Sequence, residues 1–215
     1  KTRTNQERAY WPSFWAWTKF GYNGVARDWT GRGISMVRPT NYFTYQLWNN
    51  SGENDMRNSP VNIQRVFYAA PALVGGKEIP GYDTTYVNTV KLPSGQDTVL
   101  RLKPGDPISP QWYTSRQDTM ERCFPRVMKM GSDWHYSGDP SNGFAQESYA
   151  IRLAETYLIR AEANMKAGNL EAAAADINAV RNRAGAIPVT PGEVNIDYIL
   201  DERIRELFGE ELHTL

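Results

Sequence analysis

The sequence of 215 residues has little of what several common site chemistries require. It holds one cysteine, Cys123, so no disulfide framework and no cysteine-based zinc site can form within the chain. Its two histidines, His135 and His213, are far apart and lack the spacing of a metal-binding motif or a catalytic triad. No apolar run approaches the roughly 20 residues that a membrane-spanning helix needs. Because Cys123 has no second cysteine to pair with, it is expected to be a small buried hydrophobic residue.

The chain also lacks an excess of charge of either sign. Lys+Arg and Asp+Glu number 24 each, so the formal net charge at pH 7 is zero. Proteins that bind nucleic acid normally carry a basic excess, because contacts to phosphates supply much of their affinity. No run of like charge marks a tail or a patch for an anionic membrane surface. The balance of charge argues against a nucleic-acid partner.

Aromatic residues, in contrast, are abundant, with seven tryptophans and twelve tyrosines. Five of them crowd near the start of the chain and are the candidate ligand-binding residues: Trp11, Trp15, Trp17, Tyr22 and Trp29. A sugar ring has an apolar face of C–H groups that stacks on an indole, and such burial contributes roughly 25 cal/mol per Å². Any single tryptophan is more often a packing residue, but we expect at least one of the five rings to contact ligand.

Residues 1–147 form a loop-rich aromatic region without a sustained helical period. Turn sequences such as PSGQD, KPGDP and GDPSNG separate short β-prone pieces. The sequence predicts four strands and one short helix in this region. The strands are expected at 34–37, 64–68, 85–90 and 98–102, and the helix at 42–48.

Residues 148–215 have a different sequence pattern, which predicts a helical hairpin and a third helix. Apolar residues recur at helical spacing on both sides of Gly168-Asn169, and the second stripe ends near Gly185. A turn this short makes the two helices antiparallel neighbours. The small residues Ala161, Ala173 and Ala174 allow close approach of the two backbones, as in a tetratricopeptide-like hairpin.

The third helix is predicted to begin at Ile196. It follows Thr190-Pro191-Gly192-Glu193, which has the form of a capping box with proline at the first helical position. Asp201 and Arg205 have the spacing of an ion pair on the side opposite the apolar face.

Other candidate sites carry weak signals. A glycoside hydrolase needs two carboxylates at a defined separation, and Asp118 with Glu121, or Asp133 with Asp139, are pairs that could meet this need. Scattered acidic residues are usually solvated, so the pattern is not specific. Asp139 and Asn142 offer oxygen atoms to calcium, but their segment lacks the other ligands of an EF-hand and is expected to be a turn.

The helical segments resemble a known family. RLAETYLIRAEANMKAGNLEAAAADINAVRNRAG, followed by ILDERIRELFGEE, is similar to the C-terminal signature of the SusD/RagB family of nutrient-binding outer-membrane lipoproteins from Bacteroidetes-type bacteria. Upstream, GRGISMVRPTNYFTYQLWN and DMRNSPVN also resemble the family. The resemblance is long and ordered, and it touches most of the chain.

This resemblance implies a mainly α protein with a SusD-like helical fold, a tetratricopeptide-like hairpin and a long irregular region of loops and short strands. The chain is expected to be one structural unit and the C-terminal part of a longer protein. Six charged residues recur in the family pattern and are interpreted as structural ion pairs: Arg152, Glu155, Arg160, Glu162, Glu202 and Arg203.

The resemblance also implies a function. The intact protein would bind glycans at the cell surface and pass them to a SusC-like TonB-dependent transporter of the outer membrane. It would hold no cofactor, metal or catalytic residue, and only an N-terminal lipid anchor, outside this sequence, would attach it to the membrane. Three alternatives stay open: a peptide-binding family member, a helical-repeat interaction module without a small ligand, and a glycoside hydrolase.

Overall fold

The computed structural model describes residues 11–13, 33–69, 73–74, 77–78, 86–92, 94–129 and 151–210. The chain divides into two compact units, each built from two segments. We call residues 1–38 with 64–146 the loop-rich unit, and residues 39–63 with 147–215 the helical unit. Residues 39–63 thus group with the C-terminal helices, while the expectation that the chain forms one structural unit stays a prediction.

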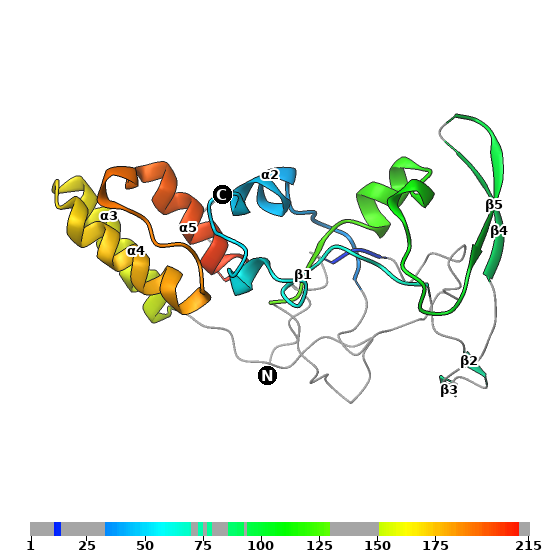
Figure 1. Ribbon diagram of the computed structural model, residues 1–215, viewed down its shortest axis with the longest axis horizontal. Helices are drawn as coiled ribbons and strands as arrows, with labels where there is room; N and C mark the ends of the chain where they lie inside the picture. Colours follow the sequence, from blue (N-terminus) through cyan, green and yellow to red (C-terminus); the bar gives the residue numbers. More distant parts are fainter. Residues whose placement is uncertain are drawn as a thin grey trace. The chain divides into compact units, whose positions relative to one another are not determined.

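The helical unit is built around three helices, α3 (Leu153–Lys166), α4 (Leu170–Ala184) and α5 (Ile196–Leu207). The helix α3 packs along α4 and also contacts α5, as the yellow, orange and red ribbons of Figure 1 show. The predicted hairpin and the predicted third helix, including its start at Ile196, are confirmed. The fold is mainly helical, as expected.

Glycines end both helices of the hairpin. Gly168, in the turn after α3, and Gly185, directly after α4, both have left-handed backbone conformations. A Cβ atom at Gly185 would also lie 2.7 Å from the carbonyl oxygen of Asn54. Only glycine meets both demands, so the end of α4 is fixed at this residue.

The core of the helical unit lies between α3, α4 and α5. Leu158, Ile177 and Ile199 are fully buried there. Ala161 and Ala173 are also fully buried, in agreement with the prediction that small residues let the hairpin helices approach closely.

Residues 39–63 join this unit through aromatic stacking. Thr40 caps α2 (Asn41–Thr44) by accepting a hydrogen bond from the N–H of Phe43, and a 3₁₀ turn follows at Gln46–Trp48. The predicted helix at 42–48 is therefore two short pieces. The ring of Phe43 stacks on Phe208 with the two centroids 4.2 Å apart, which holds α2 against the end of α5.

Charged side chains also attach residues 39–63 to α5. Arg205 donates from Nε and Nη2 to the carbonyl oxygen of Leu47, at 2.9 and 2.8 Å. Arg205 lies 3.8 Å from Asp201, as its spacing predicted, but its side chain is buried rather than on a solvent-facing side. The expectation that the pair lies on the side of α5 opposite its apolar face is therefore corrected.

The start of α5 follows the predicted sequence signals. Glu193 closes the capping box by accepting a hydrogen bond at 2.8 Å from the N–H of Thr190, around a 3₁₀ turn at Pro191–Glu193. The Asn195 side chain then caps α5 itself by accepting from the N–H of Tyr198 at 2.9 Å. Two successive caps satisfy the backbone donors that the helix start leaves open.

The described strands pair two by two. The pairs are β1 (Ile63–Gln64) with β6 (Arg126–Val127), β2 (Leu73–Val74) with β3 (Lys77–Glu78), and β4 (Tyr86–Lys91) with β5 (Asp97–Leu102). The last pair is an antiparallel hairpin, drawn in green in Figure 1, whose register runs from Tyr86 opposite Leu102 to Lys91 opposite Asp97. The predicted strands at 85–90 and 98–102 are confirmed. The strand predicted at 64–68 is shorter, because only Ile63–Gln64 belongs to a ladder.

The strand predicted at 34–37 is wrong. These residues belong to no ladder, and Ser35 has a positive φ of 54°. A non-glycine residue in this region costs backbone energy and breaks the extended run that a strand requires.

A small hydrophobic core holds the loop-rich unit together. Phe67, Val90, Leu100 and Ile108 are buried in it. Cys123 is buried among them, as expected of a small hydrophobic residue.

Candidate functional site

Trp11 is the one candidate ring among the described residues, and it is fully buried. Its Nε1 donates a hydrogen bond to the carbonyl oxygen of Val127 at 2.8 Å. The guanidinium carbon of Arg126 lies 4.0 Å from the ring centroid, a cation–π contact. Its enclosed ring serves packing, while the expectation that at least one of the five candidate rings contacts a ligand stays a prediction. The other four candidates, Trp15, Trp17, Tyr22 and Trp29, lie outside the described residues.

The residues that flank this aromatic stretch in sequence are joined to each other. The N–H of Ser35 donates to the carbonyl oxygen of Trp11 at 3.0 Å. Ser13 donates to the carbonyl oxygen of Glu121 from its N–H at 2.8 Å and from its hydroxyl at 3.1 Å. The Ser35 hydroxyl donates to the same Glu121 oxygen. Ser13 and Ser35, on either side of residues 14–32 in sequence, therefore meet at the Glu121 carbonyl.

Gly33 makes this junction possible. A Cβ atom at this position would lie 2.3 Å from the carbonyl oxygen of Pro12 and 2.5 Å from that of Trp11. Both atoms belong to the backbone, which cannot rotate away as a side chain can. The close approach of the two ends therefore requires glycine.

We expect Gly33→Ala to separate the two ends and to lower the stability of the loop-rich unit by about 1–3 kcal/mol, the usual cost of overpacking. Hydrogen exchange measures this directly, because the amides of Ser13 and Ser35 should lose protection. Gly192→Ala is the matched control, since nothing lies within 4 Å of its Cβ position. Unchanged protection at both serines would contradict this account of the junction.

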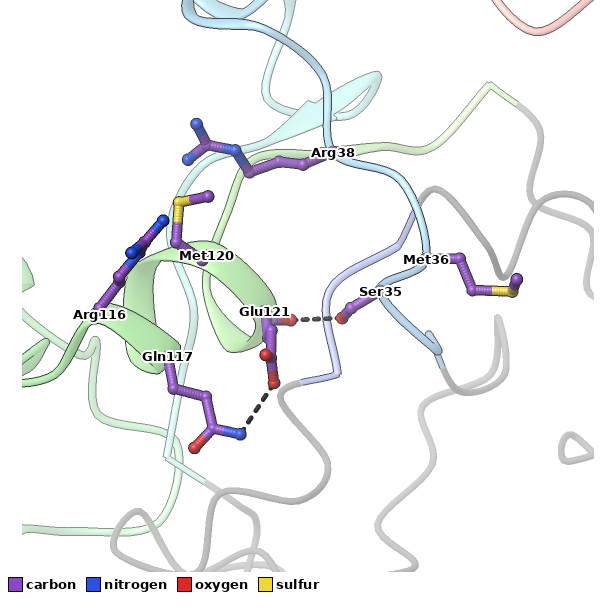
Figure 2. Close-up of a pocket in the computed structure, with 7 residues that line it drawn as sticks. All are labelled: Ser35, Met36, Arg38, Arg116, Gln117, Met120 and Glu121. Atoms are coloured by element: carbon purple, nitrogen blue, oxygen red, sulfur yellow. Dashed lines mark hydrogen bonds between the residues drawn. The ribbon is translucent and has the colours of Figure 1, made fainter.

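An open cavity of about 590 Å³ lies beside the junction (Figure 2). It is lined by Ser35, Met36, Arg38, Arg116, Gln117, Met120 and Glu121. Two segments supply these residues: the chain after the aromatic stretch, and a short helical turn that includes the π-helical residues Asp118–Arg122. Irregular π-type turns recur at functional sites, and this one presents the Glu121 carbonyl to both serines.

The carboxylate pair considered for a hydrolase is held by local bonds. Asp118 is buried and accepts hydrogen bonds from the N–H groups of Thr114 and Ser115, at 3.0 and 3.1 Å. Its second oxygen lies 3.4 Å from Arg122. The Glu121 carboxylate accepts from the Gln117 amide at 2.8 Å. Asp118 thus caps the turn. The other carboxylates considered, Asp133 and Asp139, and both histidines lie outside the described residues.

The helical unit contains a buried cluster of charge centred on Glu202. This carboxylate accepts from Arg57 at 2.7 Å, from Arg181 at 2.8 Å and from Arg205 at 3.0 Å. Burial raises the pKa of Glu202, but the three guanidinium groups outweigh burial and hold the pKa below its ordinary value. The structural role that the sequence predicted for Glu202 is confirmed.

Further ion pairs join the same helices. Arg152 lies 2.8 Å from Glu206, and Arg160 lies 2.6 Å from Asp176. Glu162 pairs with Lys166 one turn along α3. These pairs agree with the predicted structural roles of Arg152, Arg160 and Glu162. For Glu155 and Arg203 the same role stays a prediction.

Of the cavity residues, the sequence singled out Glu121, as one of the carboxylates considered for a hydrolase, but neither arginine. Arg38 lies within GRGISMVRPTNYFTYQLWN, so the resemblance pointed to its segment but not to a role for its side chain. Arg116 and Met120 carry no motif. Proline at position 39 was the available local signal, because it keeps Arg38 extended.

The described residues thus include a helical scaffold whose buried charges serve packing and, in the loop-rich unit, an open cavity next to the Glu121 junction. A mainly helical fold with an open cavity suits a binding protein. The model of the SusD family matches residues 3–214, and the chain belongs to this family. Members of the family bind glycans for uptake, are associated with the outer membrane and are not catalytic.

The other comparisons add no relative. No curated protein and no solved structure matches the chain. Among the helices of the described ranges, none is long and apolar enough to cross a membrane.

Proposed function

We propose that this protein binds polysaccharides or oligosaccharides at the cell surface for uptake through a TonB-dependent transporter of the outer membrane. Membership of the SusD family supports this function. The observation that carries the site is the junction at Glu121, which joins both ends of the aromatic stretch beside the cavity.

The ligand-contacting rings are Trp15, Trp17, Tyr22 and Trp29. Stacking on sugar C–H groups needs flat apolar rings that lose little side-chain entropy on binding, and tryptophan and tyrosine satisfy both conditions. Trp11 is not among them, because its ring is enclosed. Binding occurs without turnover, as in the rest of the family.

The helical unit serves as scaffold and meets a SusC-like transporter, while a lipid anchors the protein to the outer membrane. The apolar side chains of Ile151, Leu153 and Ile159, on and directly before α3, are exposed, which suits a surface for another protein. Membership of the family supports the transporter as partner. The exposed residues support the surface of α3 as the place where it binds.

We expect Trp15→Ala, Trp17→Ala, Tyr22→Ala and Trp29→Ala to weaken glycan binding by about tenfold each where the ring stacks on a sugar. Such a contact contributes on the order of 1 kcal/mol. Calorimetric titration against a panel of polysaccharides measures the loss, and circular dichroism checks that the helices persist. Tyr45→Ala is the control, because Tyr45 is an exposed aromatic residue of the helical unit.

Other results would redirect the proposal. If all four variants bind a confirmed glycan like the parent, the aromatic stretch is not the site. Binding of peptides alone would indicate the peptide-binding alternative, and binding of the transporter alone would indicate an interaction module. Release of reducing sugar from a polysaccharide would indicate a hydrolase.

A further inference from the structure

We propose that the cavity recognises the anionic group of an acidic saccharide, a carboxylate or a sulfate ester, through Arg38 and Arg116. The inference rests on the proposed glycan-binding function and names the class of glycan. It depends on the charge, the partners and the neighbours of these two arginines, all of which lie in the loop-rich unit.

The two arginines come from segments far apart in sequence but line one cavity. Arg38 is half-buried and follows the junction, while Arg116 is exposed and begins the helical turn. In Figure 2 both guanidinium groups lie on the same side of the cavity, with the sulfur of Met120 between them. A guanidinium group presents several N–H donors in one plane, which matches the oxygens of a carboxylate or sulfate.

Neither arginine is neutralised within the part of the chain that the structure describes. Several arginines elsewhere in the described ranges do form ion pairs, among them Arg57, Arg122, Arg152, Arg160, Arg181, Arg183 and Arg205. Within the described ranges, no carboxylate forms an ion pair with Arg38 or Arg116. Their charges are therefore available to an anion that enters the cavity.

Glu121, the acidic residue of the cavity lining, bonds to another side chain rather than to the two arginines. The Glu121 carboxylate accepts a hydrogen bond from the Gln117 amide at 2.8 Å. In Figure 2 it turns toward Gln117 rather than toward either guanidinium group. The cavity lining carries two positive charges and one negative charge, so its net charge favours an anion.

The remaining lining suits a sugar ring better than a small inorganic anion. Met36 and Met120 are exposed and give the cavity flexible apolar surface. A saccharide ring carries apolar C–H faces and hydroxyl groups next to its charged substituent. Methionine contacts to the ring and arginine contacts to the anion together select an acidic sugar over a neutral one.

The test compares glycans that differ only in charge. Binding of the full chain is measured for polygalacturonate and for its methyl ester, and for a sulfated galactan and the same polymer after desulfation. We expect the charged member of at least one pair to bind about tenfold more tightly, and the preference to weaken as salt rises. The pair that shows the preference identifies the anion as carboxylate or sulfate.

Variants connect the preference to the cavity. Arg38→Gln and Arg116→Gln should each lower affinity for the charged polymer by about fivefold, and the double variant should bind charged and neutral polymers alike. Arg101→Gln is the matched control, because Arg101 is an exposed arginine on β5 of the same unit, outside the cavity. It should bind like the parent.

Two outcomes overturn the inference in distinguishable ways. If the protein binds glycans but the double variant keeps the affinity of the parent, or charged and neutral polymers bind equally, glycan binding stands and the acidic specificity falls. If no polysaccharide of any kind binds, the proposed function falls and the inference falls with it.

Discussion

Replacing Glu202 with glutamine is expected to lower the free energy of unfolding of the helical unit by about 3–5 kcal/mol. Glu202 is fully buried, and the side chains of Arg57, Arg181 and Arg205 contact it at 2.7 to 3.0 Å. Glutamine keeps the shape but removes the negative charge, so three guanidinium groups lose their shared counter-charge in a buried setting. The loss should exceed that of any other charge-neutralising substitution in this unit.

Urea unfolding followed by far-ultraviolet circular dichroism measures this loss, because the three main helices belong to the same unit. Glu162→Gln is the matched control, since Glu162 pairs with exposed Lys166 on the surface of α3 and such pairs contribute about 1 kcal/mol or less. A Glu202→Gln variant as stable as Glu162→Gln would show that the buried cluster does not hold the unit together.

The same cluster sets a direction for the pH dependence of stability. The pKa of Glu202 is lowered in the folded protein, and the pKa of Asp55 beside Arg57 is lowered too. Their contribution is therefore complete above the ordinary pKa of a carboxyl group and is lost as the pH falls below it toward the folded value. Unfolding measured between pH 7 and pH 3 should show this loss, and Glu202→Gln should show a smaller one.

Trp11→Ala is expected to destabilise the loop-rich unit by about 3–5 kcal/mol, the usual cost of removing a large buried aromatic side chain. It removes the hydrogen bond to Val127 and leaves Arg126 without the ring that it covers. Trp11→Phe keeps most of the packing but leaves the Val127 carbonyl without its indole donor, so we expect about 1–3 kcal/mol. Hydrogen exchange of Val127 and its neighbours reports on this unit.

Val99→Ala is the control for this prediction, because Val99 is exposed on β5 of the same unit, outside the cavity, and surface truncations cost about 0.5 kcal/mol or less. The experiment also separates packing from ligand stacking. Should Trp11→Ala leave the unit as stable as the parent while glycan binding is lost, Trp11 would be a ligand contact. The interpretation of its ring as a packing residue would then be wrong.

The helical hairpin could be predicted from the sequence because its determinants are local. Apolar spacing sets the buried faces of α3 and α4, and the glycines at 168 and 185 end them. Glu202 shows the limit of such reasoning. Its structural role could be predicted from the resemblance, but its partner Arg57 lies 145 positions away, and no periodicity connects the two.

The site was harder to predict because it also depends on residues that are far apart in the sequence. The sequence placed Trp11 among the candidate ligand-binding rings because composition does not reveal which tryptophan faces a core. It made residues 34–37 a strand, since β-branched and apolar residues favour one, but the tight contact at Gly33 and the positive φ of Ser35 turn the backbone. The cavity itself depends on the segments of Arg38 and Arg116 lining one space, a long-range arrangement without a local pattern.

The division of the helical unit between two stretches of chain has a consequence for biosynthesis. Leu47 and Trp48 leave the ribosome well before α5, although Arg205 of α5 bonds to Leu47 across 158 positions. Until α5 has left the ribosome, the carbonyl oxygen of Leu47 lacks this bond, so residues 39–63 complete their unit only after α5 is available.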